Sequence, residues 1–553
     1  MNHSINQYNE CSSEKTNVVQ YLMVVGFHHK RGCLVEFCYP PLVLDDVDNR
    51  KSSSDPNDPV RLPSSWQILA SLSIPDGAHN YDSDTVFFNI PDYRSHKTLF
   101  GVSCYRQIAT KDLLVKSPDI TRSSVQKAVV ALMNYPVYGL IEYKLDIITR
   151  FYFAERDFSK TQILLDAFND FNQHFSPAIV NSPDILSGLS IRALFVRFGT
   201  QVVTLFKMLL LEKKCIFLHS PIRDLTSSIL TLCSLMPGLI QEGLNQSAIL
   251  YDKETSTISN SDSIDKQNSN VNYVKELMLQ YDQNQTQEQS NVLKDDSCDN
   301  ISRINVELLN VKTKKKLEKN DEKTDSESSL SESSSDVEAE TEAEIQARLY
   351  EIWNKPPSMH GLPLNIFGQD SYLMPYFSLS YFDLLINNRV HSFIGGSSNQ
   401  IFRRWQNNFE VFVVSSQIEI DCPNLRRALR PSTEDMHFIS YLVRAILNDN
   451  DNVDTTDIFD DSQQEFYEGS DEWIRMHFKS YLLHLLRCSL LDKESQEYRS
   501  FNPCFMDLFK QTVSYQLWAS GPGQMNVLRD LEPVHPFSSN RLNYLKLRLT
   551  KYV

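Results

Sequence analysis

The chain has 553 residues, enough for three or four domains at roughly 150 residues each, and its 41% hydrophobic residues can fill several cores. The net charge of -16 is concentrated, because residues 318–344 hold eleven acidic side chains against two lysines. The rest of the chain carries only -7. This mild acidity gives no general signal for nucleic-acid binding.

Cysteine usage and hydropathy restrict the compartment. The sequence has ten scattered cysteines and no Cys-x-x-Cys pair, which indicates a reduced, intracellular chain. We expect no metal site and no cofactor. The polar residues 1–10 lack the apolar core of a signal peptide. The most apolar runs, 202–211 and 229–240, are interrupted by Lys207 and Pro237-Gly238. We therefore expect no transmembrane helix, a cytoplasmic location and at most peripheral membrane contact.

The first module is expected over residues 18–176. A hairpin is predicted around Gly32, followed by a serine-capped helix near residues 64–72 and two further strands whose apolar residues alternate. Residues 125–133 suit either a buried strand or a helical turn, and their β-branched content favours a strand. Residues 137–154 show helical spacing, with Leu140, Ile141, Leu145, Ile148 and Phe151 on one face, and Ser159 is expected to cap a second helix. The predicted order is β-β-α-β-β-β-α-α, an antiparallel sheet with helices packed on it.

A central α/β module is expected over residues 184–430. One long helix over residues 194–209, a strand at 215–219 and a helix at 222–236 precede residues 252–349, which contain no Phe, Trp, Pro or Gly. Such a segment cannot form a core, so we interpret it as a disordered acidic insertion within one domain. Its serine-acid runs make Ser326, Ser328 and Ser333 candidate phosphorylation sites. Strands are then predicted at residues 372–379, 392–395 and 410–415.

Residues 431–553 are predicted to form a helical module. Ser432 or Thr433 should cap a helix with Met436, Ile439, Val443 and Ile446 on one side. Ser470 should cap another helix, and a last one is expected over residues 505–518. The expected fold class is therefore α/β (α+β), with an N-terminal antiparallel sheet, a split central α/β module and a C-terminal helical module.

Motifs for catalysis are missing from the sequence. It contains no phosphate loop, dinucleotide fingerprint, nucleophile elbow or His-Glu-x-x-His pair. Three weaker patterns each have a plainer alternative. His28, His29 and Cys33 suit zinc by residue type but more often belong to an ordinary strand and turn. Residues 395–399 could cradle a phosphate or simply form a tight strand-to-helix turn. Residues 312–316 are basic enough for anionic lipid or are merely solvated.

Several segments together carry a resemblance to a known family. The segments are Val24 to Lys30, Val35 to Pro41, Ile74 to Asn80, Asp84 to Phe88, Ser103 to Ile108, Asp119 to Arg122, Leu210 to Lys214, Tyr441 to Arg444 and Gly469 to Arg475. They resemble the Avl-type late-secretory-pathway proteins, a branch of the DENN-domain superfamily. The resemblance implies a longin-like uDENN module, a central cDENN module and a helical dDENN-like module.

The resemblance also implies a function in vesicle-mediated transport from the Golgi to the plasma membrane or through recycling endosomes. DENN modules typically act as guanine-nucleotide exchange factors for Rab-type small GTPases, an activity that makes no covalent bond. The alternative is a GTPase effector or scaffold for vesicle transport, cell polarity or migration that exchanges nothing. We expect a protein peripherally associated with Golgi, vesicle or recycling endosome membranes.

Candidate partner-binding residues come from the motif segments that end in turns or strand ends. They are Asp76, His79, Asn80, Tyr105 and Arg106. Each is polar for its surroundings, which suits a partner surface. The plainer interpretation is that Asp76 caps a turn, that His79 and Asn80 form hydrogen bonds with the backbone of the loop, and that Arg106 pairs with an acid on a helix.

Overall fold

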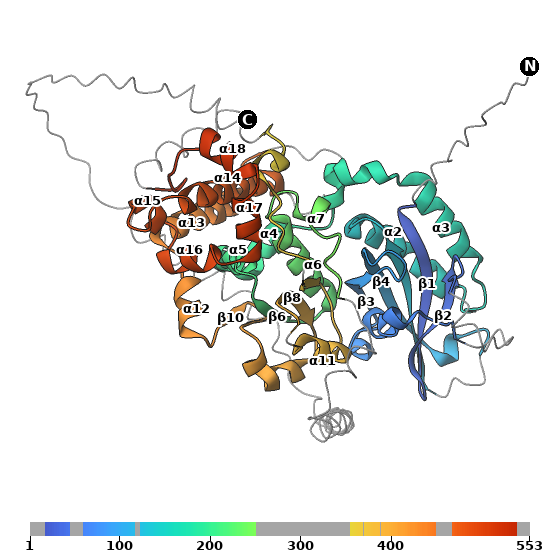
Figure 1. The fold of residues 1–553 in the computed structure, drawn as a ribbon. Coiled ribbons are helices and arrows are strands. Elements are labelled where there is room, and N and C mark those ends of the chain that lie inside the picture. Colours follow the sequence, from blue (N-terminus) through green and yellow to red (C-terminus); the bar gives the residue numbers. More distant parts are fainter. Residues whose placement is uncertain are drawn as a thin grey trace, which may run out of the picture. The chain divides into compact units, whose positions relative to one another are not determined.

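A computed structural model describes residues 17–44, 59–116, 122–249, 354–449 and 467–538, apart from Gln369 and Asn388. It confirms the expected mixed α/β class, with an antiparallel sheet first, an α/β region next and a helical C-terminal region (Figure 1). The candidate phosphorylation sites Ser326, Ser328 and Ser333 lie outside the described residues, as do the proposed insertion at 252–349 and the basic run at 312–316.

The N-terminal sheet has five antiparallel strands in the order β2-β1-β5-β4-β3. They are β1 (Val19–His28), β2 (Gly32–Tyr39), β3 (Ser83–Pro91), β4 (Thr98–Ala109) and β5 (Ser124–Met133). The prediction of a strand at residues 125–133 is confirmed, because β5 lies in the middle of the sheet and pairs with both β1 and β4.

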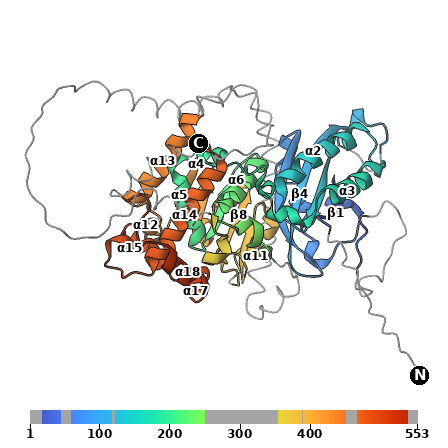
Figure 2. The same ribbon diagram turned by 90° about the horizontal axis from the view of Figure 1, so that it is seen from above.

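Two longer helices cover one face of this sheet, α2 (Tyr138–Ala154) and α3 (Gln162–His174), and the short α1 (Leu69–Ser73) contacts the other face (Figures 1 and 2). Successive residues of β4 alternate between these faces. Phe100 packs against Tyr138 of α2, whereas the Ser103 hydroxyl donates to a carbonyl of α1 at 2.7 Å. Helices on both faces make the sheet a buried layer.

Three details of this module differ from the predictions. The helix predicted near residues 64–72 is present only in part, as a 3-10 turn at Ser64–Trp66 followed by α1, and its serine cap is wrong because α1 has no side-chain cap. Ser159 does not cap α3, because its hydroxyl donates to Asp157 at 2.7 Å. Phe151 is 58% exposed, and the buried face of α2 contains Tyr138, Ile141, Leu145, Thr149 and Tyr152 instead.

The central sheet has the order β10-β9-β6-β8-β7. Its strands are β6 (Lys214–Leu218), β7 (Ser371–Met374), β8 (Ser392–Ser397), β9 (Val411–Val414) and β10 (Gln417–Glu419). All neighbours are parallel except β9 and β10. Because β6 pairs with both β8 and β9, strands from either side of residues 250–353 share one sheet. β10 was not predicted, and β7 ends before Pro375 rather than continuing to residue 379.

The described part of the central region has six helices besides its sheet. They are α4 (Ile191–Phe198), α5 (Val202–Leu210), α6 (Ile222–Ser234), α7 (Leu239–Glu242), α11 (Phe382–Leu385) and α12 (Pro423–Ala428), with a 3-10 segment at Gln400–Asn408. The single long helix predicted at 194–209 is wrong. Gly199 takes a φ of 53°, which separates α4 from α5 because a positive φ leaves the helical region.

One stretch of the described chain, Pro183–Leu210, has the length and apolar composition of a membrane-spanning helix. In this fold 61% of its most apolar window is buried inside the protein. Length and composition alone are weak evidence for a membrane span, since the core helix of a folded domain passes the same test.

The C-terminal region is helical. Its helices are α13 (Thr433–Asp449), α14 (Asp471–Ser489), α15 (Gln496–Arg499), α16 (Pro503–Phe509), α17 (Val513–Ala519) and α18 (Gly523–Asp530). Ser432 and Ser470 receive backbone hydrogen bonds from the first turns of α13 and α14, so both predicted caps are confirmed. The single last helix is wrong, because the Thr512 hydroxyl starts a new helix. Met436 is exposed, and the buried side of α13 includes Phe438 and Leu442.

A buried ionic cluster joins α5 to the C-terminal helices. The Lys207 ammonium donates to the Asp435 carboxylate at 2.8 Å and to the Phe501 carbonyl at 3.0 Å, and Tyr481 donates to Asp435 at 2.7 Å. Both charged side chains are fully buried. Burial alone would raise the pKa of Asp435, but Lys207 and His535 lower it below its usual range. The ion pair thus fixes α13 and α14 against the central module.

We expect Asp435→Asn to lower the free energy of unfolding by about 3–5 kcal/mol, because it leaves the Lys207 ammonium buried without its counter-ion. The double variant Lys207→Met/Asp435→Asn should recover much of that loss. Denaturant unfolding checks both, and Lys213→Met, which removes a half-exposed pair, is the matched control. A loss no larger than that of Lys213→Met would contradict the structural role.

We also expect stability to fall in mild acid. Burial lowers the pKa of His477 and of His219 to about 4, so the unfolded chain, with a histidine pKa of about 6.5, binds more protons than the folded chain between these values. Their contribution is complete above pH of about 6.5 and is lost as the pH falls towards 4.

His477→Gln should therefore reduce the slope of unfolding free energy against pH by up to one proton, about 1.4 kcal/mol per pH unit. Denaturant titrations at several pH values measure this slope. His437→Gln, at an exposed position of α13, should leave it unchanged. Equal slopes in wild type and His477→Gln would refute the assignment.

Candidate partner-binding site

The loop at residues 75–82 lies at the junction of the N-terminal and central modules. Gly77 has a φ of 80°, which turns the chain into a 3-10 segment, Ala78–Asn80, just before β3. The Gln107 side chain of β4 donates to the carbonyl of Tyr81 at 3.1 Å and to that of His79 at 3.5 Å. Strand β4 therefore fixes this loop, which we call the junction loop.

Asp76 connects the junction loop to the central module. Its amide donates to the Tyr376 hydroxyl at 2.9 Å, its carbonyl accepts from Ser398 at 2.9 Å, and its carboxylate accepts from the Asn399 amide at 3.2 Å. Burial raises the pKa of Asp76, and the hydrogen bond from Asn399 offsets this only in part. All its polar groups are thus used inside the protein.

The contacts of Asp76 also explain residues 395–399. A Cβ atom on Gly395 would lie 2.7 Å from Phe377, and one on Gly396 would lie 2.5 Å from the Pro375 carbonyl. The glycines are therefore required by close packing, not by positive φ angles. Since Ser398 and Asn399 bind Asp76, the structure favours the turn over the alternative of a phosphate cradle.

Asp84, the second residue of β3, makes the other main contact across the junction. Its carboxylate accepts from the amides of Ile222 and Arg223 at 3.0 and 3.2 Å, which are free donors in the first turn of α6. Burial raises the pKa of Asp84, while these amides oppose the rise. Arg223 also forms a two-pronged ion pair with Glu142 of α2, at 3.0 and 3.3 Å.

The junction loop lies at the carboxyl edge of the parallel strands. Ser398 and Asn399 follow β8, and Ser220, whose hydroxyl contacts that of Tyr81, follows β6. Open parallel sheets commonly bind their ligands outside this edge. In this protein residues of the N-terminal module occupy that place, and His79, Asn80 and Tyr81 form its exposed rim.

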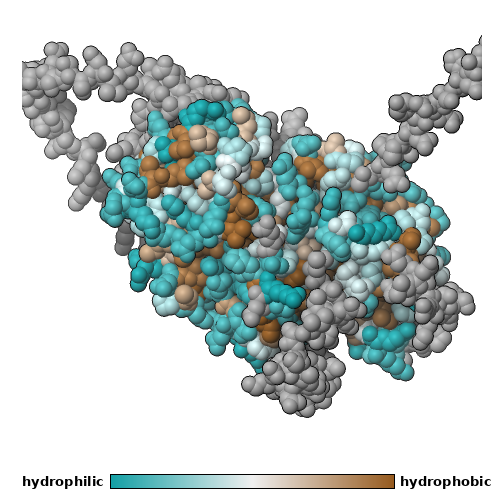
Figure 3. Space-filling model, in the orientation of Figure 1, coloured by the Kyte–Doolittle hydropathy of each residue, from teal (hydrophilic) through white to brown (hydrophobic). Residues whose placement is uncertain are grey.

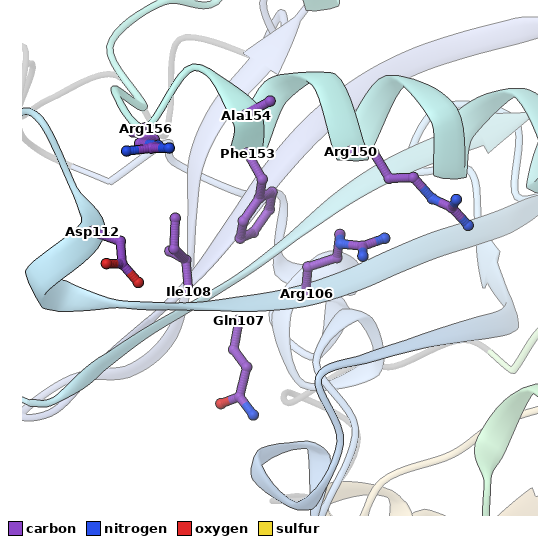
Figure 4. Close-up of a pocket in the computed structure, with 8 residues that line it drawn as sticks. All are labelled: Arg106, Gln107, Ile108, Asp112, Arg150, Phe153, Ala154 and Arg156. Atoms are coloured by element: carbon purple, nitrogen blue, oxygen red, sulfur yellow. The ribbon is translucent and has the colours of Figure 1, made fainter.

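Tyr105 and Arg106 lie on opposite faces of β4. Tyr105 is fully buried on the α1 face, where burial raises its pKa. Arg106 points toward α2 and pairs with Asp146 at 3.3 Å, as the plainer interpretation expects. Figure 4 shows Arg106 and Ile108 directed toward α2 and Gln107 directed away from it. Tyr105 therefore cannot be part of an exposed partner surface.

Arg106 lines a pocket of about 380 Å³ between β4 and the end of α2. Arg150 and Arg156 also line it, together with Asp112 and Phe153 (Figure 4). Arg150 shares Asp146 with Arg106, at 2.5 Å. Three of the eight lining residues are therefore arginines, and two of these share the Asp146 carboxylate.

The geometry around His28, His29 and Cys33 does not support zinc binding. His28 stacks on His29 with ring centroids 4.8 Å apart. Burial raises the pKa of Cys33 to about 12, which disfavours the thiolate that a metal needs. Within the described segments, no three His, Cys, Asp or Glu side chains come together as a metal site.

Residues 19–489 match the protein family described as Transport protein Avl9. This chain belongs to the Avl9 family. The expected membership is thereby confirmed, including its place in the DENN-like superfamily.

Two relatives of this Avl9-family chain are both named for the late secretory pathway. "Late secretory pathway protein avl9" of Schizosaccharomyces pombe is 33% identical over 219 residues, which are 40% of this chain and 42% of that protein. "Late secretory pathway protein AVL9" of Saccharomyces cerevisiae is 28% identical over 245 residues, 40% of this chain and 30% of that protein. The matched segments thus span less than half of each relative.

Of the five predicted site residues, the structure brings Asp76, His79 and Asn80 of this Avl9-family chain together in the junction loop and separates Tyr105 and Arg106 from them. Sequence reasoning missed Asp84, Gln107 and the Arg223–Glu142 pair. The sequence contained one sign that Asp84 makes a long-range contact, because an acidic residue at the start of an otherwise apolar strand needs a partner. That partner, an amide pair more than 130 positions away, had no local signature.

We expect Asp84→Ala to lower the free energy of unfolding by about 1–2 kcal/mol, because two amides of α6 lose their acceptor. Hydrogen exchange should accelerate at Ile222 and Arg223. The matched control Asp170→Ala changes an exposed acid on α3 and should alter neither quantity. Unchanged protection at Ile222 in Asp84→Ala would show that the cap does not hold the junction.

Proposed function

We propose that this chain is a peripheral trafficking protein of the late secretory pathway that acts on a Rab-type small GTPase as a guanine-nucleotide exchange factor. Support comes from its membership of the Avl9 family and from the names of its two relatives. Late secretory transport is the broader part of the proposal. The exchange activity is the finer part and follows from the likeness to DENN modules.

The observation that carries the finer part is the rim of the junction. His79, Asn80 and Tyr81 are exposed there, while Asp76 and Asp84 bind the two modules together directly beneath them. A partner on this rim would contact both modules at once. We propose this rim as the centre of the GTPase interface.

An exchange factor acts through a binding surface and does not need a pair of catalytic residues. It works by binding the nucleotide-free GTPase more tightly than the loaded form, and a preference of about ten-thousandfold corresponds to about 5.5 kcal/mol. Specific and stable protein–protein complexes usually bury about 1,600 Å² in total. Figure 3 shows hydrophobic residues in separate small clusters among hydrophilic ones on the face in view. A non-obligate interface is about as apolar as the rest of a protein surface.

The test is release of labelled GDP from purified Rab GTPases. We expect the full chain to accelerate release from at least one member of a complete Rab panel. Flat kinetics across the panel would refute exchange. If the chain instead captures only the GTP-loaded form, the alternative of an effector or scaffold replaces it, because an exchange factor prefers the nucleotide-free form.

The double variant His79→Ala/Asn80→Ala should reduce the exchange rate about tenfold or more, corresponding to about 1.4 kcal/mol or more of lost interface energy. The melting temperature should stay unchanged because both side chains are exposed. His437→Ala, an exposed histidine on α13, is the matched control and should exchange normally. Equal loss of melting temperature and rate would indicate a structural role for the loop.

A further inference from the structure

The outer face of α2 carries a stripe of exposed apolar side chains. Tyr143, Ile147 and Phe151 are 63%, 37% and 58% exposed. Residues four apart on a helix lie above one another, so these three form one continuous line. Large apolar side chains in a line are an unusual surface for a protein and commonly mark a contact site.

The other sides of α2 are already occupied. Its inner side packs on the sheet, Glu142 pairs with Arg223 of α6, and Asp146 pairs with Arg106 of β4. Lys144 lies 4.5 Å from the ring centre of Phe175, which follows α3. Among the described residues, the stripe is thus the side of α2 that the fold leaves open.

A second pair of exposed apolar residues adjoins the end of α2. Leu114 and Val115 are 72% and 55% exposed, although the preceding Leu113 is buried. The Leu114 amide donates to the Arg156 carbonyl at 3.0 Å, which places these residues at the C-terminal end of α2. We call Leu114, Val115, Tyr143, Ile147 and Phe151 the α2 face.

The two segments that carry the α2 face contain more basic than acidic residues, although Arg106 and Arg150 pair with Asp146 and Lys160 pairs with Glu155. Residues 106–116 and 143–160 contain seven Lys or Arg against four Asp or Glu, a local excess of positive charge in a chain whose net charge is -16. Lys111 and Lys116 are exposed on either side of the Leu114–Val115 pair. Arg150 and Arg156 line the neighbouring pocket (Figure 4).

We propose that the α2 face docks on an anionic phospholipid bilayer. Aromatic and aliphatic side chains edged by Lys and Arg are the composition of protein surfaces that lie in the membrane interface. The apolar side chains would enter the boundary between headgroups and acyl chains, while the lysines and arginines would attract acidic headgroups. A few side chains and a modest charge give reversible binding, as a peripheral protein needs.

A bilayer fits these observations better than a protein partner does. The exposed residues lie on an outward helix side and on a loop beside it, and half of the residues that line the nearby pocket are charged, so it is not an apolar groove. An amphipathic partner helix would need an apolar groove. The inference deepens the proposed trafficking function, because it supplies the contact through which the protein would reach its membrane.

The experiment is flotation of the full chain with vesicles of phosphatidylcholine mixed with phosphatidylserine, compared with vesicles of phosphatidylcholine alone. We expect binding to the mixed vesicles that weakens at high salt, since salt screens exposed charges. Leu114→Asp/Val115→Asp and Phe151→Asp should each reduce the partition coefficient about tenfold or more. Lys111→Gln/Lys116→Gln should reduce it roughly fivefold for each cation removed.

The controls are Val196→Asp on α4 and Met525→Asp on α18, which change equally exposed apolar residues outside the α2 face. Both should float like wild type, and unaltered melting temperatures would show that every variant folds. The proposal is overturned if wild type does not bind mixed vesicles, if the α2-face variants bind normally, or if the controls lose as much binding.

The same variants separate this inference from the proposed function. GDP release measured in solution without vesicles should remain normal in Leu114→Asp/Val115→Asp. If that variant loses exchange but still floats, the α2 face binds a protein and the membrane proposal is wrong. If wild type floats but exchanges nothing, membrane docking stands and the exchange proposal falls.

Discussion

Carboxylates that cap helices belonging to another part of the fold hold this protein together. Asp84 of the N-terminal sheet accepts from the first turn of α6, Asp471 of α14 accepts from the first turn of α4, and Glu212 after α5 accepts from that of α17. In each case an acid meets amides that have no partner within their own helix and the positive end of its dipole. The same contact that caps the start of a helix therefore also joins two regions of the chain.

This mode of joining determines what kind of surface the protein can present. An apolar contact tolerates sliding, whereas a carboxylate bonded to two amides fixes distance and direction. With Asp76 and Asp84 at one junction and Glu212, Asp471 and the buried Lys207–Asp435 pair at the other, the three regions are fixed in register. A surface built across such junctions is preorganised, and a partner that binds there need not supply the ordering energy.

Local patterns predicted most elements, and long-range contacts account for most of the failures. The β-branched content of residues 125–133 favoured the strand β5, and the caps at Ser432 and Ser470 were visible because a cap lies within three residues of its amide. The break at Gly199 was missed, since apolar spacing continued through it. At the site, sequence reasoning placed His79 and Asn80 in a turn region and offered pairing of Arg106 with a helix acid as one alternative, but it gave no sign that β4 buries Tyr105.

Phe151 shows how such a failure can lead to function. Its spacing assigned it to the core of α2, because periodicity finds the apolar residues of a helix and cannot say which of two apolar faces is buried. The structure buries Tyr138, Leu145 and Tyr152 and leaves Phe151 aligned with Tyr143. A helix needs only one apolar side to pack on its sheet, and α2 has two. The surplus side is where an external surface of matching chemistry can bind.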